Sequence, residues 1–452
     1  MNKKYAIIFV VSLIALAFLW QSTHKSISKS ASIREYTSNV PEDVKKDAVV
    51  KLSNVEIASV YESVTDGAYY FNRSIENVSR ILGETNTDLI FRGWLRWKPA
   101  PESPSEPIGF FTKEEIENNA KWGYTYEQLK EAITEIKRDN PDIIFTGAIL
   151  PIISVNERNP VTGESFDRDQ TWAMALDAEK WSAGISKEDL QCILIGTTYS
   201  EYKINCPKDF DRSKTPIYYP DITNSNFQEL LLSWAKKQID AGVDALWIDL
   251  LYTQADMFED YARKHPFKSK AARDASKESF EAASKIVDEI HAYGYSKGKY
   301  IYVGTWNDFV YYPYAQPNID FVTVTPQPAE IVSKKLDSGK WDEKVSNIKG
   351  KLGNVPIFAF IDWSYEDNRP LAVFSQNLSK DEQKNFLITA DKFFQEKGIM
   401  FAYPVHGGSI GPNAKQLAYG GWKVYDTWQT YDSLAQEFET YETIRELSRI
   451  KE

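Results

Sequence analysis

Histidine and cysteine are scarce in this sequence, which has four His and two Cys among 452 residues. The histidines stand at positions 24, 265, 291 and 406, and no two have the spacing of metal ligands on one helix. No acidic loop carries the Gly and Glu of a calcium-binding loop. A phosphate-binding glycine loop and a dinucleotide fingerprint are also missing. We therefore expect no metal centre and no cofactor.

A surplus of basic residues is missing too. Lys and Arg number 53 against 64 Asp and Glu, which gives a net charge of -11. Phosphate backbones are bound by clustered Lys and Arg, and the sequence has no such cluster, which excludes a nucleic-acid partner. Aromatic residues, by contrast, make up 14% of the chain, with 13 Trp, 26 Tyr and 23 Phe. Their flat apolar faces suit the stacking of sugar rings.

The N-terminus contains an uncharged run. Lys3 and Lys4 precede residues 5–20, which carry no charge. The run is short for a membrane-spanning helix of roughly 20 residues but suits a signal peptide or signal anchor. Residues 21–32 offer no convincing small-x-small cleavage site, which favours an uncleaved anchor. We expect the body of the chain to lie outside the cell, either membrane-anchored or secreted.

This reading divides the chain into an anchor or signal peptide at 1–22, a polar tether at 23–52 and a single domain at 53–452. We expect the protein to be a monomer. N-glycosylation sequons fit an extracellular location, and three of them begin at Asn72, Asn77 and Asn377.

The two cysteines lie close together in the sequence. Cys192 is followed by Ile-Leu-Ile-Gly-Thr-Thr, and Cys206 is preceded by Lys-Ile-Asn. These segments resemble the two arms of a hairpin. In an oxidising compartment we expect a disulfide between Cys192 and Cys206 rather than two free thiols.

Apolar strand-like runs alternate with amphipathic helical runs along most of the chain. The helical runs include 75–82, 126–138 and 381–397, and residues 53–70 are expected on the outside of the domain. Eight strands with helical connections predict an α/β fold, a (β/α)8 TIM barrel with a disulfide-bearing insertion at 151–215, after the second strand. If the third strand were absent, an open sheet would remain an alternative. The predicted strands are 88–97, 143–150, 216–219, 243–250, 300–306, 319–325, 355–362 and 399–405.

The strand at 243–250 is the centre of the predicted barrel. It is almost wholly apolar and ends in one carboxylate, Asp249. The helix before it, at 227–240, has Asn224 and Ser225 where an N-cap belongs and is closed by Gly242. A carboxylate at the C-terminal end of such a strand lies where parallel barrels place their active sites. The structural alternative is that Asp249 only caps the next turn.

Other strand ends supply the rest of a site. Carboxyl groups, indoles and amides together suit the cleavage of glycosidic bonds, which needs a carboxylic acid, a second carboxylate and aromatic faces for the sugar. The structural alternative is that several of these residues are strand-end caps or partners of Arg96. The candidate catalytic residues are Asp249, Asp362, Asp308 and Glu330. The candidate substrate-binding residues are Arg96, Trp97, Asp221, Trp306, Asn307, Trp363 and His406.

Residues 220–249, Pro-Asp-Ile-Thr-Asn-Ser-Asn-Phe through Gly242-Val-Asp-Ala-Leu-Trp-Ile-Asp249, resemble secreted barrel glycoside hydrolases. The resemblance is nearest to the glycoside hydrolase family 114 type, which acts on polymers containing galactosamine. It implies that Asp249 is the nucleophile and that the acid follows a later strand, for which Asp362 is favoured. The chain departs from those families at Ala245, where they have Gly, and at Leu250, where they have a polar residue.

Two other functions remain open. No motif specifies a second carboxylate, so a barrel that binds cell-surface glycan without cleaving it is the first alternative. The second is a serine esterase, because Gly407-Gly-Ser409-Ile-Gly411 follows an apolar strand and precedes a predicted helix at 413–419. That mechanism needs a His downstream of the Ser, and the last His in the chain is His406.

Overall fold

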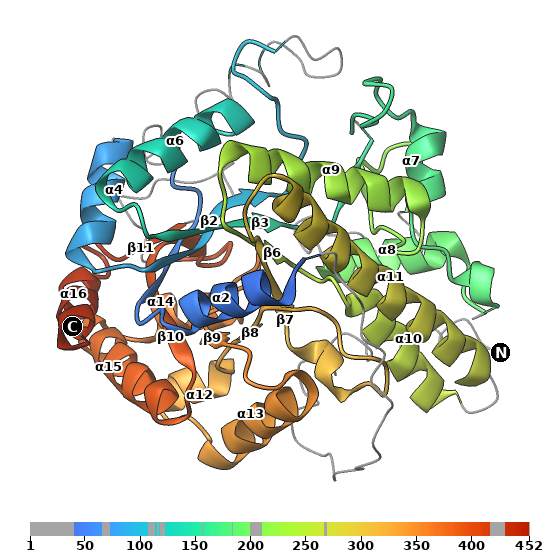
Figure 1. Ribbon diagram of the computed structural model, residues 1–452. Coiled ribbons are helices and arrows are strands. Elements are labelled where there is room, and N and C mark those ends of the chain that lie inside the picture. The colour runs from blue at the N-terminus through green and yellow to red at the C-terminus, as the bar shows by residue number, and fades with distance from the viewer. Residues whose placement is uncertain are drawn as a thin grey trace.

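The computed structural model describes residues 40–65, 73–106, 114, 117, 123–155, 157–182, 184–198, 210–265, 269–415 and 430–451. Its centre is a barrel of eight parallel strands in the order β1-β2-β3-β6-β7-β8-β9-β10, closed by the pairing of β1 with β10 (Figure 1). The predicted TIM barrel is confirmed. The barrel strands are β1 (Ala58–Tyr61), β2 (Leu89–Arg96), β3 (Ile144–Ile149), β6 (Ala245–Ile248), β7 (Tyr302–Trp306), β8 (Phe321–Val324), β9 (Ile357–Ala359) and β10 (Met400–Ser409).

One predicted barrel strand is wrong, and one barrel strand was not predicted. The segment at 216–219 contains β5 (Ile217–Tyr218), which pairs only with β4 (Ile153–Ser154) in a separate two-stranded sheet. The barrel instead begins with β1, in the segment that we expected on the outside. Both runs are short and apolar, so their local pattern does not tell which sheet they join. A further strand, β11 (Thr430–Asp432), runs antiparallel to β10.

Helices surround the barrel in the usual alternation (Figure 1). The predicted helices at 75–82, 126–138 and 381–397 are observed with nearly the same bounds. The helices around the barrel are α4 (Ile75–Glu84), α6 (Tyr126–Asp139), α9 (Ser225–Ala241), α10 (Thr253–Lys264), α11 (Ser269–Ser296), α12 (Pro328–Ser333), α13 (Ser338–Leu352), α14 (Pro370–Asn377), α15 (Lys380–Glu396) and α16 (Tyr441–Ile450).

The caps of helix α9 show how the local sequence positions strand β6. The Asn224 side chain accepts hydrogen bonds from the backbone N–H groups of Asn226 and Phe227, at 3.0 and 3.2 Å. Gly242 ends the helix with a φ of 115°, a conformation that costs glycine little. Both predicted caps are confirmed. The chain therefore turns directly from α9 into β6, which carries Asp249 just past its end.

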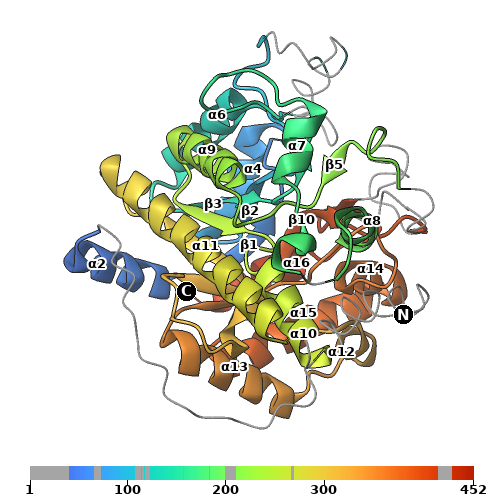
Figure 2. The ribbon, with the colours of Figure 1, turned by 90° about the vertical axis from the view of Figure 1, so that its right-hand side faces the viewer.

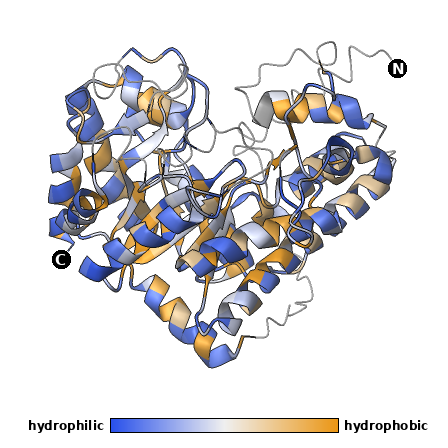
Figure 3. Cartoon of the chain, turned by 90° about the horizontal axis from the view of Figure 1, so that it is seen from above, coloured by the Kyte–Doolittle hydropathy of each residue, from blue (hydrophilic) through white to orange (hydrophobic). Residues whose placement is uncertain are grey.

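Apolar side chains fill two concentric layers. One lies between the strands and the helices, and the other fills the barrel interior, where Phe91, Trp247 and Phe360 are buried. Figure 3 shows the apolar strands in the middle, with hydrophilic surfaces on the surrounding helices. Aromatic rings of the interior layer, in contact with one another, become part of the site described below.

Helix α2 (Glu42–Ser53) lies across the N-terminal end of the barrel (Figure 1). Leu52 is 1% exposed and packs in the interior layer, and the Tyr302 hydroxyl donates to the backbone oxygen of Ala48 at 3.0 Å. Residues 42–52 are therefore a helix docked on the barrel rather than part of a polar tether. The apolar residues of this helix dock it on the barrel. The charged residues between them obscure the helical pattern in the sequence.

The insertion after β3 lies at the opposite end of the barrel from α2 (Figure 2). It contains β4, α7 (Arg168–Met174), a 3-10 helix at Ala178–Trp181 and α8 (Lys187–Thr198). Cys192 is buried within α8, so the predicted hairpin arm is wrong, because this segment buries its apolar residues as a helix. Cys206 lies outside the described residues, and the disulfide stays a prediction.

The predicted anchor at 1–22 and the sequon residue Asn72 also lie outside the described residues. Across the described ranges, no helix is both long and apolar enough to cross a membrane.

Candidate active site

Asp249 lies directly after β6, at the C-terminal end of the barrel strands, which we call the mouth. Its backbone N–H donates to the oxygen of Ile149 at 2.9 Å. Its Oδ1 accepts a hydrogen bond from the Trp306 indole at 2.7 Å. The next residue, Leu250, has a φ of 55°, a left-handed conformation that is uncommon for a side chain of this size. The chain turns sharply here, and the carboxylate is left at the mouth.

Burial raises the pKa of Asp249 above its usual value. Three features oppose this effect: the positive charge of Arg92, the Trp306 hydrogen bond and the backbone N–H of Leu250. Each of them stabilises the anion, so the structure supplies specific support for a negative charge at this position.

Asp362 follows β9 and belongs to the same mouth. Its backbone N–H donates to the Thr325 hydroxyl at 3.1 Å. The pKa of Asp362 is raised to about 7, mainly by burial and in part by the negative charge of Asp249, while the positive charges of Arg369 and Arg92 act in the opposite direction. The charges of the two carboxyl groups therefore interact, and Asp362 retains its proton to higher pH than an ordinary Asp.

Between these two residues the mouth has an aromatic floor, made by Phe91, Trp247, Trp306, Phe360 and Trp363. Ring centroids are 5.6 Å apart for Trp247 and Trp306, 5.1 Å for Trp306 and Phe360, and 5.7 Å for Phe360 and Trp363. The Trp247 indole donates to the Thr323 hydroxyl at 3.0 Å, which holds its ring in place. Trp306 and Trp363 are half-buried, so part of each ring faces the mouth.

Two charged residues of the mouth, Glu62 and Arg92, were not among the candidates predicted from the sequence. Glu62 directly follows β1, the strand that was not predicted, and Arg92 lies inside β2. Their side chains form an ion pair at 3.0 Å, and the Arg92 guanidinium lies 4.1 Å from the centroid of the Trp363 ring. A signal for Arg92 was present in Gly93, since a glycine inside a strand often marks a bulge.

Two glycines allow the backbone of β10 to pass close to Glu62 and Trp363. Gly407 and Gly408 have φ values of 100° and 86°. A Cβ on Gly407 would lie 2.3 Å from the Glu62 side chain, and one on Gly408 would lie 2.7 Å from Trp363. The backbone N–H of Gly408 donates to Glu62 Oε2 at 2.7 Å. The glycines thus allow the backbone to approach two mouth residues.

The prediction of a nucleophile elbow at Ser409 is wrong. Ser409 is the last residue of β10, is 4% exposed and pairs with Thr430 of β11. Residues 413–415 are not helical, and 416–419 lie outside the described residues. A nucleophile elbow needs a strand, a sharp turn and then a helix, whereas here the strand continues into an antiparallel pairing.

His406 belongs to a buried ionic network at the edge of the mouth. Its Nδ1 lies 2.6 Å from Asp432 Oδ2, and Arg73 Nη1 lies 2.9 Å from the same oxygen. Arg73 also donates to the Tyr61 hydroxyl at 2.9 Å. Burial acts to raise the pKa of Asp432, but His406 and Arg73 outweigh it and hold this pKa below its usual value. The His406 backbone oxygen accepts from the Glu62 N–H at 3.0 Å, so the network supports the end of β1.

Arg96 and Trp97 are adjacent in the sequence but have different environments. Arg96 is fully buried, pairs with Glu157 and lies 3.3 Å from the centroid of the Trp234 ring in α9. It therefore stabilises the barrel wall. Trp97 is 36% exposed, and its backbone N–H donates to the Tyr124 hydroxyl at 2.9 Å. Its indole is on the surface, where a sugar could stack.

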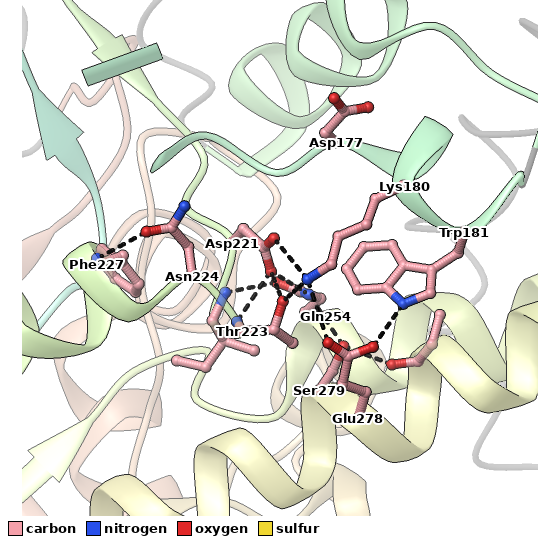
Figure 4. Close-up of polar contacts among 12 residues, drawn as sticks. Asp177, Lys180, Trp181, Asp221, Thr223, Asn224, Phe227, Gln254, Glu278 and Ser279 are labelled. Carbon is pink, nitrogen blue, oxygen red and sulfur yellow. Dashed lines mark hydrogen bonds and ion pairs between the residues drawn. The ribbon is translucent and has the colours of Figure 1, made fainter. Parts of the chain in front are cut away.

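Asp221 organises the loop before α9 (Figure 4). Its Oδ1 accepts from the Thr223 backbone N–H and hydroxyl, at 2.9 and 2.7 Å, and from Gln254 Nε2 at 2.9 Å. Lys180 Nζ lies 3.7 Å from its other oxygen. Because β5 is outside the barrel, Asp221 is a residue of the insertion and not of a barrel strand. Its described contacts are those of a structural residue.

Glu330 is a capping residue of α12. Its Oε2 accepts from the Gln327 backbone N–H at 2.8 Å, and its Oε1 accepts from the Asp337 N–H and the Trp341 indole, both at 2.9 Å. Three donors therefore occupy its two oxygens, which leaves little capacity for proton transfer.

Asn307 and Asp308 follow β7. Asn307 is 5% exposed, and Asp308 begins a 3-10 helix, Asp308–Tyr311. The pKa of the Asp308 carboxyl group is raised to about 6, chiefly by burial and to a smaller extent by the negative charge of Asp249, while the positive charge of Lys344 acts in the opposite direction. In the described part of the chain, no cluster of three His, Cys, Asp or Glu residues has the arrangement of a metal site. The structure thus brings Asp249, Asp362, Trp306 and Trp363 together at the mouth.

The fold and the site define this chain as a TIM-barrel protein with two interacting carboxyl groups over an aromatic floor. No protein-family model matches it, and no curated protein does.

Among solved structures, the α-amylase from H.orenii has a TM-score of 0.47 at 13% identity, over 88% of this chain and 82% of that chain. An α-amylase from Malbranchea cinnamomea has a TM-score of 0.41 at 10% identity, over 89% and 78%. The α-galactosidase TtGalA from Thermus thermophilus has a TM-score of 0.38 at 10% identity, over 77% of this chain and 58% of that chain. The chain therefore spans less than two thirds of the α-galactosidase. These TM-scores are too low to carry an argument about function, so the proposed function depends on the site residues.

Proposed function

We propose that this protein is a glycoside hydrolase that cleaves a polysaccharide or surface glycan with two carboxyl groups, Asp249 and Asp362. The observation that carries the proposal is the difference between their environments at one mouth. Asp249 has the Trp306 indole as a hydrogen-bond donor at 2.7 Å, whereas burial and the charge of Asp249 keep Asp362 protonated to about pH 7. General acid catalysis beside an anion requires one carboxyl group that holds its proton and a second that is stabilised as the anion.

The roles follow from those protonation states. Asp362 donates its proton to the glycosidic oxygen, and the sugar leaves as an alcohol. Asp249 attacks the anomeric carbon as a carboxylate and forms a glycosyl ester. Asp362, now ionised, then takes a proton from water, which hydrolyses the ester and restores both groups. The resemblance of residues 220–249 to barrel glycoside hydrolases supports Asp249 as the nucleophile.

The aromatic floor supports a sugar substrate. Trp306 and Trp363 present parts of their rings beside the two carboxyl groups, and sugars stack their C–H faces on such rings. Trp97 offers a further exposed indole. We also propose, from the same resemblance, that the substrate is a polymer containing galactosamine and that the enzyme relates to the family 114 type.

Location and processing belong to this proposal as well. The uncharged run at 5–20 supports a membrane-anchored or secreted protein that acts outside the cell as a monomer. Asn77 and Asn377 are exposed, as glycosylation of their sequons would require. A disulfide between Cys192 and Cys206 fits the same compartment.

The test combines product detection with chemical rescue. Purified protein is incubated with a panel of polysaccharides, including polygalactosamine, and new reducing ends are measured over time. We expect reducing ends from the wild-type protein and none from Asp249→Ala. Added azide should restore turnover of an activated aryl glycoside by Asp249→Ala and yield a glycosyl azide, since azide fits the space left by the carboxylate.

The outcomes separate the candidate functions. Glycan-dependent thermal stabilisation without any product from the whole panel would replace the hydrolase with the glycan-binding barrel. Full activity of Asp249→Ala would refute its assignment as nucleophile.

A further inference from the structure

We propose that Arg92 is a positioning residue that supplies a positive charge acting on both catalytic carboxyl groups and holds Trp363 at the mouth. This inference rests on the proposed function for its catalytic meaning, but its physical content concerns the charge of Arg92 and can be measured without substrate.

The backbone at Arg92 is the first observation. Arg92 has a φ of 56° inside a barrel strand, and the pairing of β2 with β3 shifts register between Ile90 and Trp94. A non-glycine residue in this conformation costs on the order of 1 kcal/mol or more, and such residues gather at functional sites. An ordinary strand would alternate its side chains between interior and exterior. The bulge breaks that alternation, and it brings the Arg92 side chain over the aromatic floor.

The guanidinium is then held from several directions. Its Nη2 lies 3.0 Å from Glu62 Oε1, and its centre lies 4.1 Å from the Trp363 ring centroid and 5.2 Å from that of Trp247. Glu62 is itself fixed by the Gly408 N–H at 2.7 Å. Stacking on two indoles favours a planar guanidinium over an ammonium group.

Arg92 also has a group that no structural contact uses. Its Nε–H is buried and has no hydrogen-bond acceptor among the described residues. A buried donor left without an acceptor is costly and calls for a reason. Retention of a positive charge beside Asp249 and Asp362 supplies that reason.

The charges around Arg92 decide the direction of its effect. Its own charge lowers the pKa of both Asp249 and Asp362. Several other charged groups face the mouth from the surrounding elements, namely Glu62 after β1, Asp308 after β7 and Arg369 before α14. Carboxylates outnumber cations in this set. Without Arg92, Asp249 would have only the Trp306 indole and one backbone N–H to support its anion.

The experiment is a direct titration of the two carboxyl groups. The protein is labelled with 13C at Asp Cγ, and the two signals are assigned with Asp249→Asn and Asp362→Asn. Wild type is compared with Arg92→Met and Arg92→Gln, which remove the charge, and with Arg92→Lys, which keeps it. We expect the pKa values of both carboxyl groups to rise by about one unit in the uncharged variants and to stay near wild type in Arg92→Lys, given the usual effect of a nearby cation on a carboxyl group.

A second readout concerns the reaction. The pH profile of kcat/KM should move to higher pH in Arg92→Gln and return towards wild type in Arg92→Lys. A residue with a merely structural role would lower activity at every pH without moving the profile.

Two results would overturn the inference: unchanged carboxyl titrations in both uncharged variants, or equal shifts in Arg92→Lys and Arg92→Met. Use of two uncharged variants and one charged variant keeps the test valid when one of them fails to fold. A wild-type protein that cleaves no glycan but shows the expected titrations would refute the proposed hydrolase and leave the charge effect of Arg92 intact.

Discussion

The indole nitrogen of Trp306 donates a hydrogen bond to Asp249 Oδ1 at 2.7 Å. Asp249 directly follows β6, and Trp306 ends β7, so the hydrogen bond joins the ends of two adjacent barrel strands. It fixes the orientation of a carboxylate and joins it to the aromatic floor. Several of the expected experimental outcomes follow from this pair.

Trp306→Phe keeps an aromatic ring but removes the donor to Asp249. We expect kcat/KM to fall about 10- to 100-fold, the usual worth of a hydrogen bond to a charged group, and the Asp249 titration to move to higher pH. Trp341→Phe is the matched control, since its indole donates to Glu330 at 2.9 Å away from the mouth. Equal losses of kcat/KM in both variants would contradict a specific role for Trp306.

Asp249→Asn removes the nucleophile with almost no change in shape. We expect kcat to fall by about 10³-fold or more, as for other lost nucleophiles. Asp221→Asn makes the same substitution at another buried Asp, where an amide oxygen can still accept from Thr223 and Gln254. That control should keep kcat and lose at most about 1–2 kcal/mol of stability. Steady-state kinetics and thermal melts of the two variants decide the point.

Asp362 must be protonated to act as the acid, and its pKa is about 7. We therefore expect kcat/KM to decline as pH rises above about 7. Asp362→Asn should lose this alkaline limb and should retain far more activity on aryl glycosides with good leaving groups than on natural glycans. A pH profile of Asp362→Asn that matches wild type would assign the acid to another residue, with Asp308 the first to test.

The same raised pKa makes a prediction for stability. The folded state holds the Asp362 proton more tightly than the unfolded chain, where Asp titrates near about 3.9. The stabilising effect of this protonation is fully present below the unfolded pKa and is lost as pH rises towards about 7. Asp362→Asn cannot ionise, so its melting temperature relative to wild type should increase between pH 4 and pH 8. A constant difference across that range would show that Asp362 has an ordinary pKa.

Gly408→Ala tests the close passage of β10 over the mouth. The residue has a φ of 86°, and a Cβ there would lie 2.6 Å from Leu371 and 2.7 Å from Trp363. We expect a loss of about 1–3 kcal/mol in unfolding free energy, together with lower activity as Trp363 is displaced. Gly350→Ala, within α13 and with open space around it, should be neutral or slightly stabilising. Unfolding in urea measures both.

Local patterns in the sequence predicted the barrel, the caps of α9 and the buried strand β6. The caps depend on nearby residues, since Asn224 accepts from the N–H groups of Asn226 and Phe227 and Gly242 directly follows the last residue of α9. Such features can be predicted without the rest of the chain. The same patterns predicted that Asp249 and Asp362 follow strands, and parallel strands in one barrel bring such residues to the same end.

Longer-range relationships were out of reach. The segments at 58–61 and 216–219 are both short and apolar, and only the closure of the barrel between β1 and β10 shows which of them is a barrel strand. Because β1 was missed, Glu62 was missed as well. The contacts of Arg96 with Glu157 and Trp234 were equally invisible, since these partners are far away in the sequence.

The sequence by itself determined the class of fold and the carboxyl groups at the strand ends, because hydrophobic periodicity and capping act over short stretches of chain. Only the tertiary structure decided which side chains share the mouth. The bulge at Arg92 changes the face on which the following residues lie, and such a shift of register depends on the neighbouring strands. The environment of each carboxyl group, and with it its pKa, is therefore a property of the assembled barrel.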